Sequence, residues 1–540
     1  MEQSAHVDTF ARDRLPPPEQ WPEFRFTIPA VQYPPRVNCA AELLDCMVDQ
    51  GFGDRPALVA ADGRRTYAEL LADANRVANV LRDELGLVPG NRVLLHGFNN
   101  ATTATLWLAV VKAGGIAVTT MPLLRAKELT EVVVKAQRAI AIGDRRLAAE
   151  LEAARPQCPT LQTVVYSHDD RPAALAARMA RRSAAFANCD TATDDVALIA
   201  FTSGTTGKPK GTMHFHRDLL AICDTFAPAL VGAGPSDVFT GTPPLAFTFG
   251  LGGILLFPLR VGASTVLLEK VTPASLLTAI AAEKVTICFT APTSYRAMTP
   301  LVAGHDLRHL RVCVSAGEAL PIATRAGWEA ATGIKIVDGI GSTEMLHIFI
   351  GAAGDAIRPG ATGKAVPGYI ACVLDERGAP LAPGNVGRLA VKGPTGCRYL
   401  DDARQTEYVH DGWNITGDAY VMDDDGYFWY QSRTDDMIVS SGYNIAGPEV
   451  EAALLEHPAV LECAVVGIPD PERTQLVTAY VVLRAGTPAS AELRRDLQDF
   501  VKATIAPYKY PRAIHFIDAL PRTQTGKLQR FKLRQPGAPA

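Results

Sequence analysis

Phe201-Thr-Ser-Gly-Thr-Thr-Gly-Lys-Pro-Lys-Gly211 is the stretch of this 540-residue chain that decides its fold. It directly follows the apolar run 196–201, which predicts a buried strand. Glycines let backbone N–H groups approach phosphate oxygens, hydroxyls donate hydrogen bonds, and lysines neutralise charge. The segment therefore predicts an anion-binding loop after a strand, made of Thr202, Ser203, Gly204, Thr205, Thr206, Gly207 and Lys208.

Short apolar runs alternate with helical patterns on both sides of this loop. The runs expected to form strands are 92–97, 116–120, 196–201, 264–268, 285–289, 311–315 and 335–337. Alternation at this spacing predicts βαβ units and an α/β fold with mostly parallel sheets. Residues 140–195, which are rich in Ala and Arg, are expected to form surface helix and linker.

The composition of the sequence changes near residue 360, beyond which Gly, Pro and Asp become more frequent. We predict an N-terminal arm over 1–36, a large domain over 37–433 with a β-rich subdomain from about 360, and a mobile α+β C-terminal domain over 434–540.

Composition excludes several classes of protein. Hydrophobic residues make up 48% and charged residues 20%, which is ordinary for a globular chain and excludes a disordered one. The net charge of −4 favours neither nucleic acid nor an anionic membrane. The ten cysteines show no zinc-ligand spacing, and no signal peptide or membrane-spanning run is visible. We expect a cytoplasmic protein with no nucleic-acid or membrane partner.

Further polar motifs follow strands or turns. They are Ser315-Ala-Gly-Glu-Ala-Leu320, Gly339-Ile-Gly-Ser-Thr-Glu344, Thr416-Gly-Asp418, Ser432-Arg-Thr-Asp-Asp-Met-Ile438 and Pro521-Arg-Thr-Gln-Thr-Gly-Lys527.

The loop and these motifs, in this order, resemble the adenylate-forming superfamily of acyl- and aryl-CoA synthetases, luciferases and peptide-synthetase adenylation domains. The resemblance covers about residues 40 to 533. It implies that Thr343 contacts the α-phosphate of ATP, that Glu344 holds Mg²⁺, and that Lys527 reaches the carboxylate and the α-phosphate. It further implies nucleotide contacts for Ala316, Gly317, Glu318, Asp338, Gly339, Ile340, Gly341, Ser342, Asp418 and Arg433, and a hinge at Asp435.

Two positions depart from the superfamily pattern. Ile340 stands where an aromatic residue often stacks on adenine, and this aliphatic replacement resembles the benzoate-type ligases. Ser432 replaces a usual Gly. The implied reaction joins a carboxylate to ATP as acyl-AMP, with release of pyrophosphate, and then transfers the acyl group to coenzyme A. In the second step Ser441, Gly442 and Tyr443 are expected to wall the pantetheine tunnel.

The acyl pocket is expected to include Phe247, Gly250, Leu251, Ala291 and His347. A compact aromatic-lined pocket suits a flat aryl acid better than a fatty chain. Residues 211–218 and 14–21 resemble 2-aminobenzoate–CoA ligases, which favours that acid, with benzoate or a substituted benzoate next. His347 is either an ordinary buried histidine, a partner for an ortho substituent, or a group that helps position the carboxylate.

Three alternatives stay open at this point. A kinase or NTPase is disfavoured because Lys208 is followed by Pro209 rather than Ser or Thr. A carrier-protein thiol could replace coenzyme A, although no carrier-like segment follows residue 533. The third alternative belongs to another functional class, a nucleotide-binding protein without catalytic activity. The sequence also leaves open whether the protein forms a homodimer.

Overall fold

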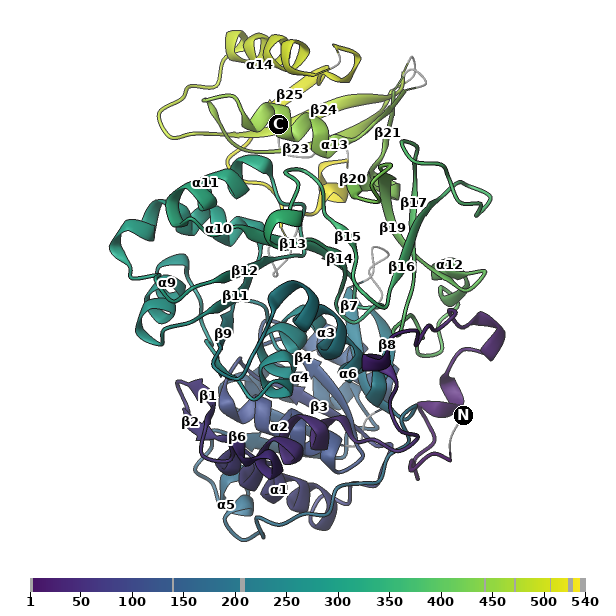
Figure 1. Cartoon of the computed structure of the whole chain (residues 1–540), viewed down its shortest axis with the longest axis vertical. Coiled ribbons are helices and arrows are strands. Elements are labelled where there is room, and N and C mark those ends of the chain that lie inside the picture. Colours follow the sequence, from purple (N-terminus) through teal and green to yellow (C-terminus); the bar gives the residue numbers. More distant parts are fainter. Residues whose placement is uncertain are drawn as a thin grey trace.

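The computed structural model describes residues 3–137, 140–203, 209–440, 443–470, 473–505, 507–522 and 528–534. Two large sheets and their helices form the body, a smaller antiparallel sheet lies beside them, and a C-terminal unit rests on top (Figure 1). The predicted α/β class is therefore confirmed.

The first sheet has the strand order β6-β5-β3-β4-β7-β8 among the described residues. Every pair is parallel except the β7–β8 hairpin. Its strands are β3 (Arg92–His96), β4 (Ile116–Thr120), β5 (Ile140–Asp144), β6 (Thr163–Ser167), β7 (Val196–Ser203) and β8 (Pro209–Phe215). Strands β3, β4 and β5 are buried along their whole length, as helix-covered parallel strands are.

The prediction of surface helix and linker over residues 140–195 was wrong for two segments. Residues 140–144 and 163–167 form β5 and β6 of this sheet instead of surface helix and linker. The short run Ile140-Ala-Ile-Gly-Asp144 carries little periodicity by itself, and its burial comes from pairing with β3.

The second sheet has the order β15-β14-β13-β12-β11-β9-β10-β1-β2 within the described ranges. Its central strands are parallel, and β2, β14 and β15 run antiparallel to their neighbours. The strands are β1 (Pro56–Ala60), β2 (Gly63–Thr66), β9 (Val238–Gly241), β10 (Ser264–Val266), β11 (Ile287–Thr290), β12 (Val312–Ser315), β13 (Ile336–Gly341), β14 (Ile348–Gly351) and β15 (Lys364–Ala365).

Helices cover these two sheets and pack several apolar clusters against them. They are α1 (Tyr67–Asp83), α2 (Ala101–Lys112), α3 (Ala126–Ala136), α4 (Ala148–Ala154), α5 (Leu175–Met179), α6 (His216–Phe226), α7 (Thr248–Leu251), α8 (Phe257–Arg260), α9 (Pro273–Ala282), α10 (Pro292–Met298) and α11 (Ile322–Thr332). Local sequence fixes their starts: Thr66 and Glu69 form a capping box for α1, and Asn100 caps α2.

An antiparallel sheet follows, made of β16 (Ile370–Leu374), β17 (Val386–Lys392), β18 (Val409–His410), β19 (Trp413–Met422) and β20 (Phe428–Arg433), with α12 (Gln405–Tyr408) beside it. The described part of the C-terminal unit holds another sheet and three α-helices: β21 (Ile438–Ser440), β22 (Tyr443–Ile445), β23 (Val460–Asp470), β24 (Thr474–Leu483), β25 (Ala513–Phe516), α13 (Gly447–Leu455), α14 (Ala491–Thr504) and α15 (Arg530–Leu533). It has an apolar core of its own. The domain boundaries given above stay predictions.

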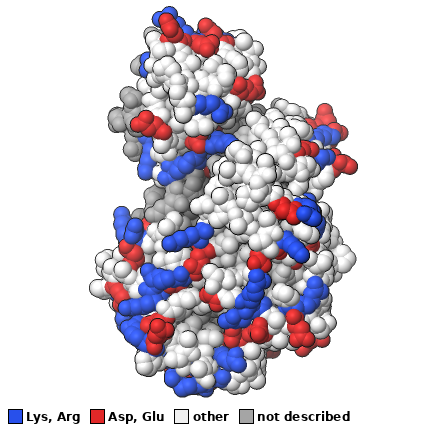
Figure 2. Space-filling view, turned by 90° about the vertical axis from the view of Figure 1, so that its left-hand side faces the viewer, with Lys and Arg blue, Asp and Glu red and all other residues white. Residues whose placement is uncertain are grey.

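The outer surface carries both signs of charge. Figure 2 shows basic and acidic side chains interspersed over one face, with the C-terminal unit standing on the body. No described helix is long and apolar enough to cross a bilayer.

Candidate active site

The predicted phosphate-binding loop is carried by the hairpin at the edge of the first sheet. The β7–β8 register places Thr202 opposite Lys210 and Ser203 opposite Pro209. The connecting residues Gly204, Thr205, Thr206, Gly207 and Lys208 lie outside the described residues. The pairing of β7 with β8 therefore holds the residues at both ends of the loop in place. Lys210 Nζ, just beyond it, lies 3.4 Å from the hydroxyl oxygen of Tyr399.

Thr343 and Glu344 lie in a tight turn directly after β13. The turn is closed by Leu346 N, which donates to the carbonyl of Thr343 over 3.1 Å, and by Met345 N, which donates to Ser342 Oγ over 3.1 Å. The side chain of Glu344 accepts a hydrogen bond from the Tyr399 hydroxyl over 2.5 Å, and the residue is only 9% exposed. The turn thus holds one nearly buried carboxylate in a defined orientation.

The predicted adenine segments lie at the carboxyl ends of β12 and β13. The parallel register pairs Ser315 with Asp338, so residues 316–318, which follow β12, lie beside residues 339–341, the last residues of β13. Burial raises the pKa of Asp338 to about 7, although the nearby Arg325 opposes the shift. The pairing of β12 with β13 therefore brings these two segments together.

The predicted ribose carboxylate, Asp418, faces Arg433 across β19 and β20. Arg433 Nη1 lies 3.1 Å from Asp418 Oδ1. Gly417 has a φ of +76°, and a Cβ there would lie 2.8 Å from Arg433 Nη2, so glycine allows this pairing. Burial raises the pKa of Tyr420, and the charges of Asp418 and Asp338 raise it further.

His347 lies in a cage of aromatic rings. Its ring centroid is 4.6 Å from Phe257, 4.9 Å from Phe226, 5.6 Å from Phe249 and 6.3 Å from Phe289. Burial lowers the pKa of His347 to about 3, and the main chain of Phe249 only partly offsets the shift. Neither ring nitrogen makes a hydrogen bond of good geometry to a described group. The imidazole is therefore neutral at pH 7 and can accept a hydrogen bond from a ligand.

The other predicted pocket residues lie on two helix starts. Phe247 precedes α7, and Leu251 N donates to its carbonyl over 2.7 Å. A Cβ at Gly250 would lie 2.1 Å from the carbonyl of Pro244, so only glycine fits this bend. Ala291 stands at the start of α10, directly after β11. Gly252 brings the α7 side of the pocket to His347, since a Cβ there would lie 2.6 Å from its Cδ2.

Several predicted residues lie outside the described part of the chain. They are Lys527, Ser441 and Gly442, together with the side chains of Ser203, Asp435 and Tyr443. The backbone of Asp435 lies in the short helical turn Thr434–Asp436, and that of Tyr443 begins β22.

The segment that carries Lys527 is anchored on both sides. Arg522 and Leu528 form an antiparallel bridge, and Gln529 N donates to the carbonyl of Pro521 over 2.8 Å. Arg522 Nη1 also lies 3.4 Å from Glu318 Oε1, in the predicted adenine turn. Arg522, from which this segment starts, therefore lies beside the predicted adenine turn.

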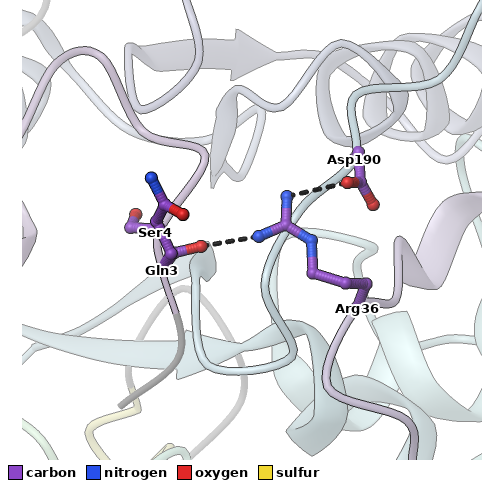
Figure 3. A pocket seen from close by; sticks show the side chains of 4 residues that line it. All are labelled: Gln3, Ser4, Arg36 and Asp190. Carbon is purple, nitrogen blue, oxygen red and sulfur yellow. Dashed lines mark hydrogen bonds and ion pairs between the residues drawn. The ribbon is translucent and has the colours of Figure 1, made fainter.

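Two cavities in the described part of the chain contain none of these residues. A pocket of about 500 Å³ is lined by Gln3, Ser4, Arg36 and Asp190. Figure 3 shows Arg36 between the carbonyl of Gln3, at 2.6 Å, and Asp190, at 3.1 Å. It contains none of the predicted site residues.

Two tyrosines were missed by the sequence reasoning. Tyr399 bonds Glu344, and the Tyr408 hydroxyl lies 3.1 Å from Ser342 Oγ. They come from loop and helix segments that no strand-end pattern marks. The aromatic residues that surround His347 were also missed, because each belongs to a different apolar run.

Magnesium fits Glu344 as one ligand among several. Within the described ranges, no group of three or more His, Cys, Asp or Glu side chains could hold a metal ion. Mg²⁺ commonly keeps waters and is bound through one or two carboxylates plus substrate phosphates. A single oriented carboxylate therefore suits an ion that arrives with ATP.

Comparison with known proteins agrees with this geometry. Residues 48–398 match the family model described as AMP-binding enzyme, and residues 449–527 match the AMP-binding enzyme C-terminal domain. A benzoate–CoA ligase of Thauera aromatica is 38% identical over 514 residues, which cover 94% of this chain and 98% of that protein.

Two solved structures are also similar over nearly the whole chain. An anthranilate–CoA ligase in complex with anthranoyl-AMP has a TM-score of 0.88 and 34% identity, covering 94% of this chain and 98% of that one. A benzoate–CoA ligase from Burkholderia xenovorans LB400 has a TM-score of 0.83 and 33% identity, covering 92% and 100%.

The chain therefore belongs to the AMP-binding enzyme family, the adenylate-forming superfamily that its motifs resemble. Within it the chain is an AMP-forming acyl-CoA synthetase, of the aryl-CoA ligase type, that uses ATP and coenzyme A.

Proposed function

We propose that this synthetase activates 2-aminobenzoate in preference to other aromatic acids. The observation that carries the proposal is the neutral, buried His347 inside a cage of four phenylalanine rings. The rings suit a flat arene, and an imidazole nitrogen without a hydrogen-bond partner suits an ortho amino group that donates. The similarity to an anthranilate–CoA ligase supports the same choice.

In the first half-reaction, a carboxylate oxygen of the acid attacks the α-phosphorus of ATP. The bond to the bridging oxygen breaks, and pyrophosphate leaves with the electron pair. Thr343 and Lys527 stabilise the charge on the α-phosphate, while the loop 202–208 binds the outer phosphates. Mg²⁺, held in part by Glu344, supplies charge neutralisation when it is bound. Positioning and electrostatics carry such a step without an enzyme nucleophile.

Other residues hold the nucleoside. Asp418 accepts the ribose hydroxyls, Arg433 supports that carboxylate, and Asp338 with residues 316–318 and 339–342 contacts the adenine side. The 3.1 Å contact between Arg433 and Asp418 supports this arrangement, because it fixes the carboxylate before the ligand arrives.

In the second half-reaction, the thiol of coenzyme A attacks the acyl carbonyl carbon, and AMP leaves with the bridging oxygen. We propose that the C-terminal domain turns about Asp435 between the two steps. Residues 441–443 then replace the Lys527 segment beside the site. The separate apolar core of the C-terminal unit supports this motion, since such a unit can move as one body.

The substrate proposal is tested with a panel of acids. CoA-dependent AMP release should be measured with 2-aminobenzoate, 3-aminobenzoate, benzoate and hexanoate. We expect 2-aminobenzoate to have the highest kcat/KM, by about tenfold over benzoate, the value of one net hydrogen bond. Benzoate is the second candidate, because a benzoate–CoA ligase is 38% identical. Equal or higher kcat/KM with benzoate would favour that acid and reject the amino-group contact.

A further inference from the structure

Behind the predicted magnesium carboxylate lies a buried polar network that the sequence motifs do not mark. His214 on β8 is completely buried, and its Nε2 lies 2.8 Å from the carbonyl oxygen of Thr343. A carbonyl oxygen only accepts, so Nε2 carries the proton and donates it. His214 therefore holds the main chain of the residue that precedes Glu344.

The backbone at this turn is strained. Leu346 has a φ of +69°, in the left-handed region that non-glycine residues avoid, at a cost of roughly 1–2 kcal/mol. Such a conformation persists only where its surroundings hold it. The carbonyl of Thr343 accepts from both Leu346 N and His214 Nε2, so the histidine bond reinforces the bond that closes the strained turn.

A buried ion pair lies next to His214. Asp218 and Arg398 contact each other through Oδ2 and Nη2, and both side chains are fully buried. His214 Nδ1 lies 3.7 Å from Asp218 Oδ2, beyond hydrogen-bond distance but within reach of its charge. The guanidinium of Arg398 stacks on Phe215 at 3.8 Å and on Phe24 of the N-terminal segment at 4.7 Å.

The neighbour of Arg398 reaches the same turn from another direction. Tyr399 donates its hydroxyl to Glu344 Oε1 over 2.5 Å. The strand-like segment that carries both residues pairs with β8, since Met213 N donates to the carbonyl of Arg398 over 2.8 Å and Thr212 bridges Tyr399. One pair of backbone segments therefore supports both the main chain of Thr343 and the carboxylate of Glu344.

We propose that His214 and Tyr399 are positioning residues for adenylate formation: His214 fixes the main chain of Thr343, and Tyr399 fixes the carboxylate of Glu344. The inference rests on the roles proposed above for Thr343 and Glu344. Loss of either hydrogen bond lets the α-phosphate and metal contacts shift, and a displacement of about 1 Å can cost about 100-fold in rate.

The test compares His214→Leu, which removes the donor, with His214→Gln, whose side-chain amide can restore it. We expect His214→Leu to lower the kcat of ATP–pyrophosphate exchange about 10- to 100-fold, with the KM for the aromatic acid changed less than about twofold. His214→Gln should recover activity to within about threefold of wild type. Equal kcat losses in both variants, or an unchanged kcat in His214→Leu, would overturn the proposal.

A second readout does not depend on turnover. Binding of a non-hydrolysable ATP analogue should be measured by calorimetry with and without Mg²⁺. We expect His214→Leu and Tyr399→Phe to lose most of the Mg²⁺-dependent gain in affinity while their affinity without Mg²⁺ stays the same. An unchanged Mg²⁺-dependent gain in both variants would overturn the proposal. Tyr399→Phe keeps the ring in place, so the test stands even if His214→Leu fails to fold.

His216 provides the matched control. It is also completely buried, two residues further along, but its Nδ1 accepts from Cys39 N over 3.1 Å and it has no bond to the turn. His216→Gln should lower Tm and leave the kcat and the Mg²⁺-dependent gain unchanged. If it reduces them as His214→Leu does, the effect is general destabilisation and the proposal fails.

The variant Glu344→Gln distinguishes a failure of this inference from a failure of the role proposed for Glu344. If Glu344→Gln keeps wild-type exchange activity, the role of Glu344 is wrong and this inference falls with it. If Glu344→Gln is impaired and the His214 and Tyr399 variants are not, the role of Glu344 stands and only this inference fails.

Discussion

Arg522 and Glu318 join the C-terminal unit to the body, with Arg522 Nη1 3.4 Å from Glu318 Oε1. Glu462 extends the contact, because it lies 3.2 Å from Arg522 Nη2 and 2.5 Å from Arg296 Nη2. Arg522 stands five residues before Lys527, and Glu318 stands in the predicted adenine turn. The contact therefore belongs to an arrangement in which the Lys527 segment starts beside the nucleotide site.

Arg522→Ala should weaken that arrangement. The groups are partly exposed, so each ion pair contributes only about 0.2–1 kcal/mol, and we expect ATP–pyrophosphate exchange to fall about two- to fivefold. Salt should lower exchange in wild type more than in the variant, because it screens the same pairs. Arg308→Ala, which removes an exposed pair with Asp306, is the control and should change neither. Identical salt dependence in Arg522→Ala and wild type would contradict a role for this contact.

Lys527→Ala should separate the two half-reactions. In the proposed mechanism the ammonium group stabilises charge that grows during attack on the α-phosphate, so we expect ATP–pyrophosphate exchange to fall about 100- to 1,000-fold. Thioester formation from supplied acyl-AMP should stay within about threefold, because Lys527 has left the site in that step. Stopped assays with synthetic 2-aminobenzoyl-AMP measure the second rate. Equal losses in both rates would speak against reorientation of the C-terminal domain.

Asp338→Asn should change how stability depends on pH. Burial raises the pKa of Asp338 to about 7 from its ordinary value of 3.8, so the folded chain binds this proton more tightly than the unfolded chain does. Its contribution to stability is therefore present below about pH 4 and is lost as pH rises through about 7. The variant should gain on the order of 1–3 kcal/mol over wild type at pH 8 and less at pH 5. Urea unfolding at both pH values checks this, and an equal change at both would count against a buried, titrating Asp338.

His347→Phe should reduce discrimination between acids. The new ring removes the nitrogen acceptor and preserves an apolar wall, so kcat/KM for 2-aminobenzoate should fall about tenfold. The value for benzoate should stay within about threefold, which makes it the internal control. Parallel losses for both acids would show that His347 shapes the pocket without contacting the amino group.

Much of the fold follows from local patterns in the sequence. The runs at 92–97, 116–120 and 311–315 are strands in the structure, as β3, β4 and β12. Strand β13 runs from Ile336 through Gly341, beyond the predicted 335–337, because Ile340 and Gly341 pair with β14. Such pairing is a tertiary effect that a short window does not contain.

The candidate site likewise contains residues that the sequence predicts and residues that depend on tertiary contacts. Motifs at strand ends indicate Asp338, Thr343 and Glu344, since parallel strands bring their carboxyl ends to one edge. The support from Tyr399 and His214 depends on where the segment after β17 crosses β8, and no spacing in the sequence encodes that crossing. The roles assigned to the site residues stay predictions until the variants are measured.

The central claim is that this chain forms an aryl-adenylate at the site built around Glu344 and Lys527. The most direct measurement incubates the enzyme with 2-aminobenzoate and Mg²⁺-ATP in the absence of coenzyme A and analyses the products by mass spectrometry. We expect enzyme-bound 2-aminobenzoyl-AMP and an equal amount of pyrophosphate, with the adenylate lost in Glu344→Gln. Formation of ADP and phosphate, or intact ATP with every aromatic acid supplied to a folded enzyme, would contradict the account.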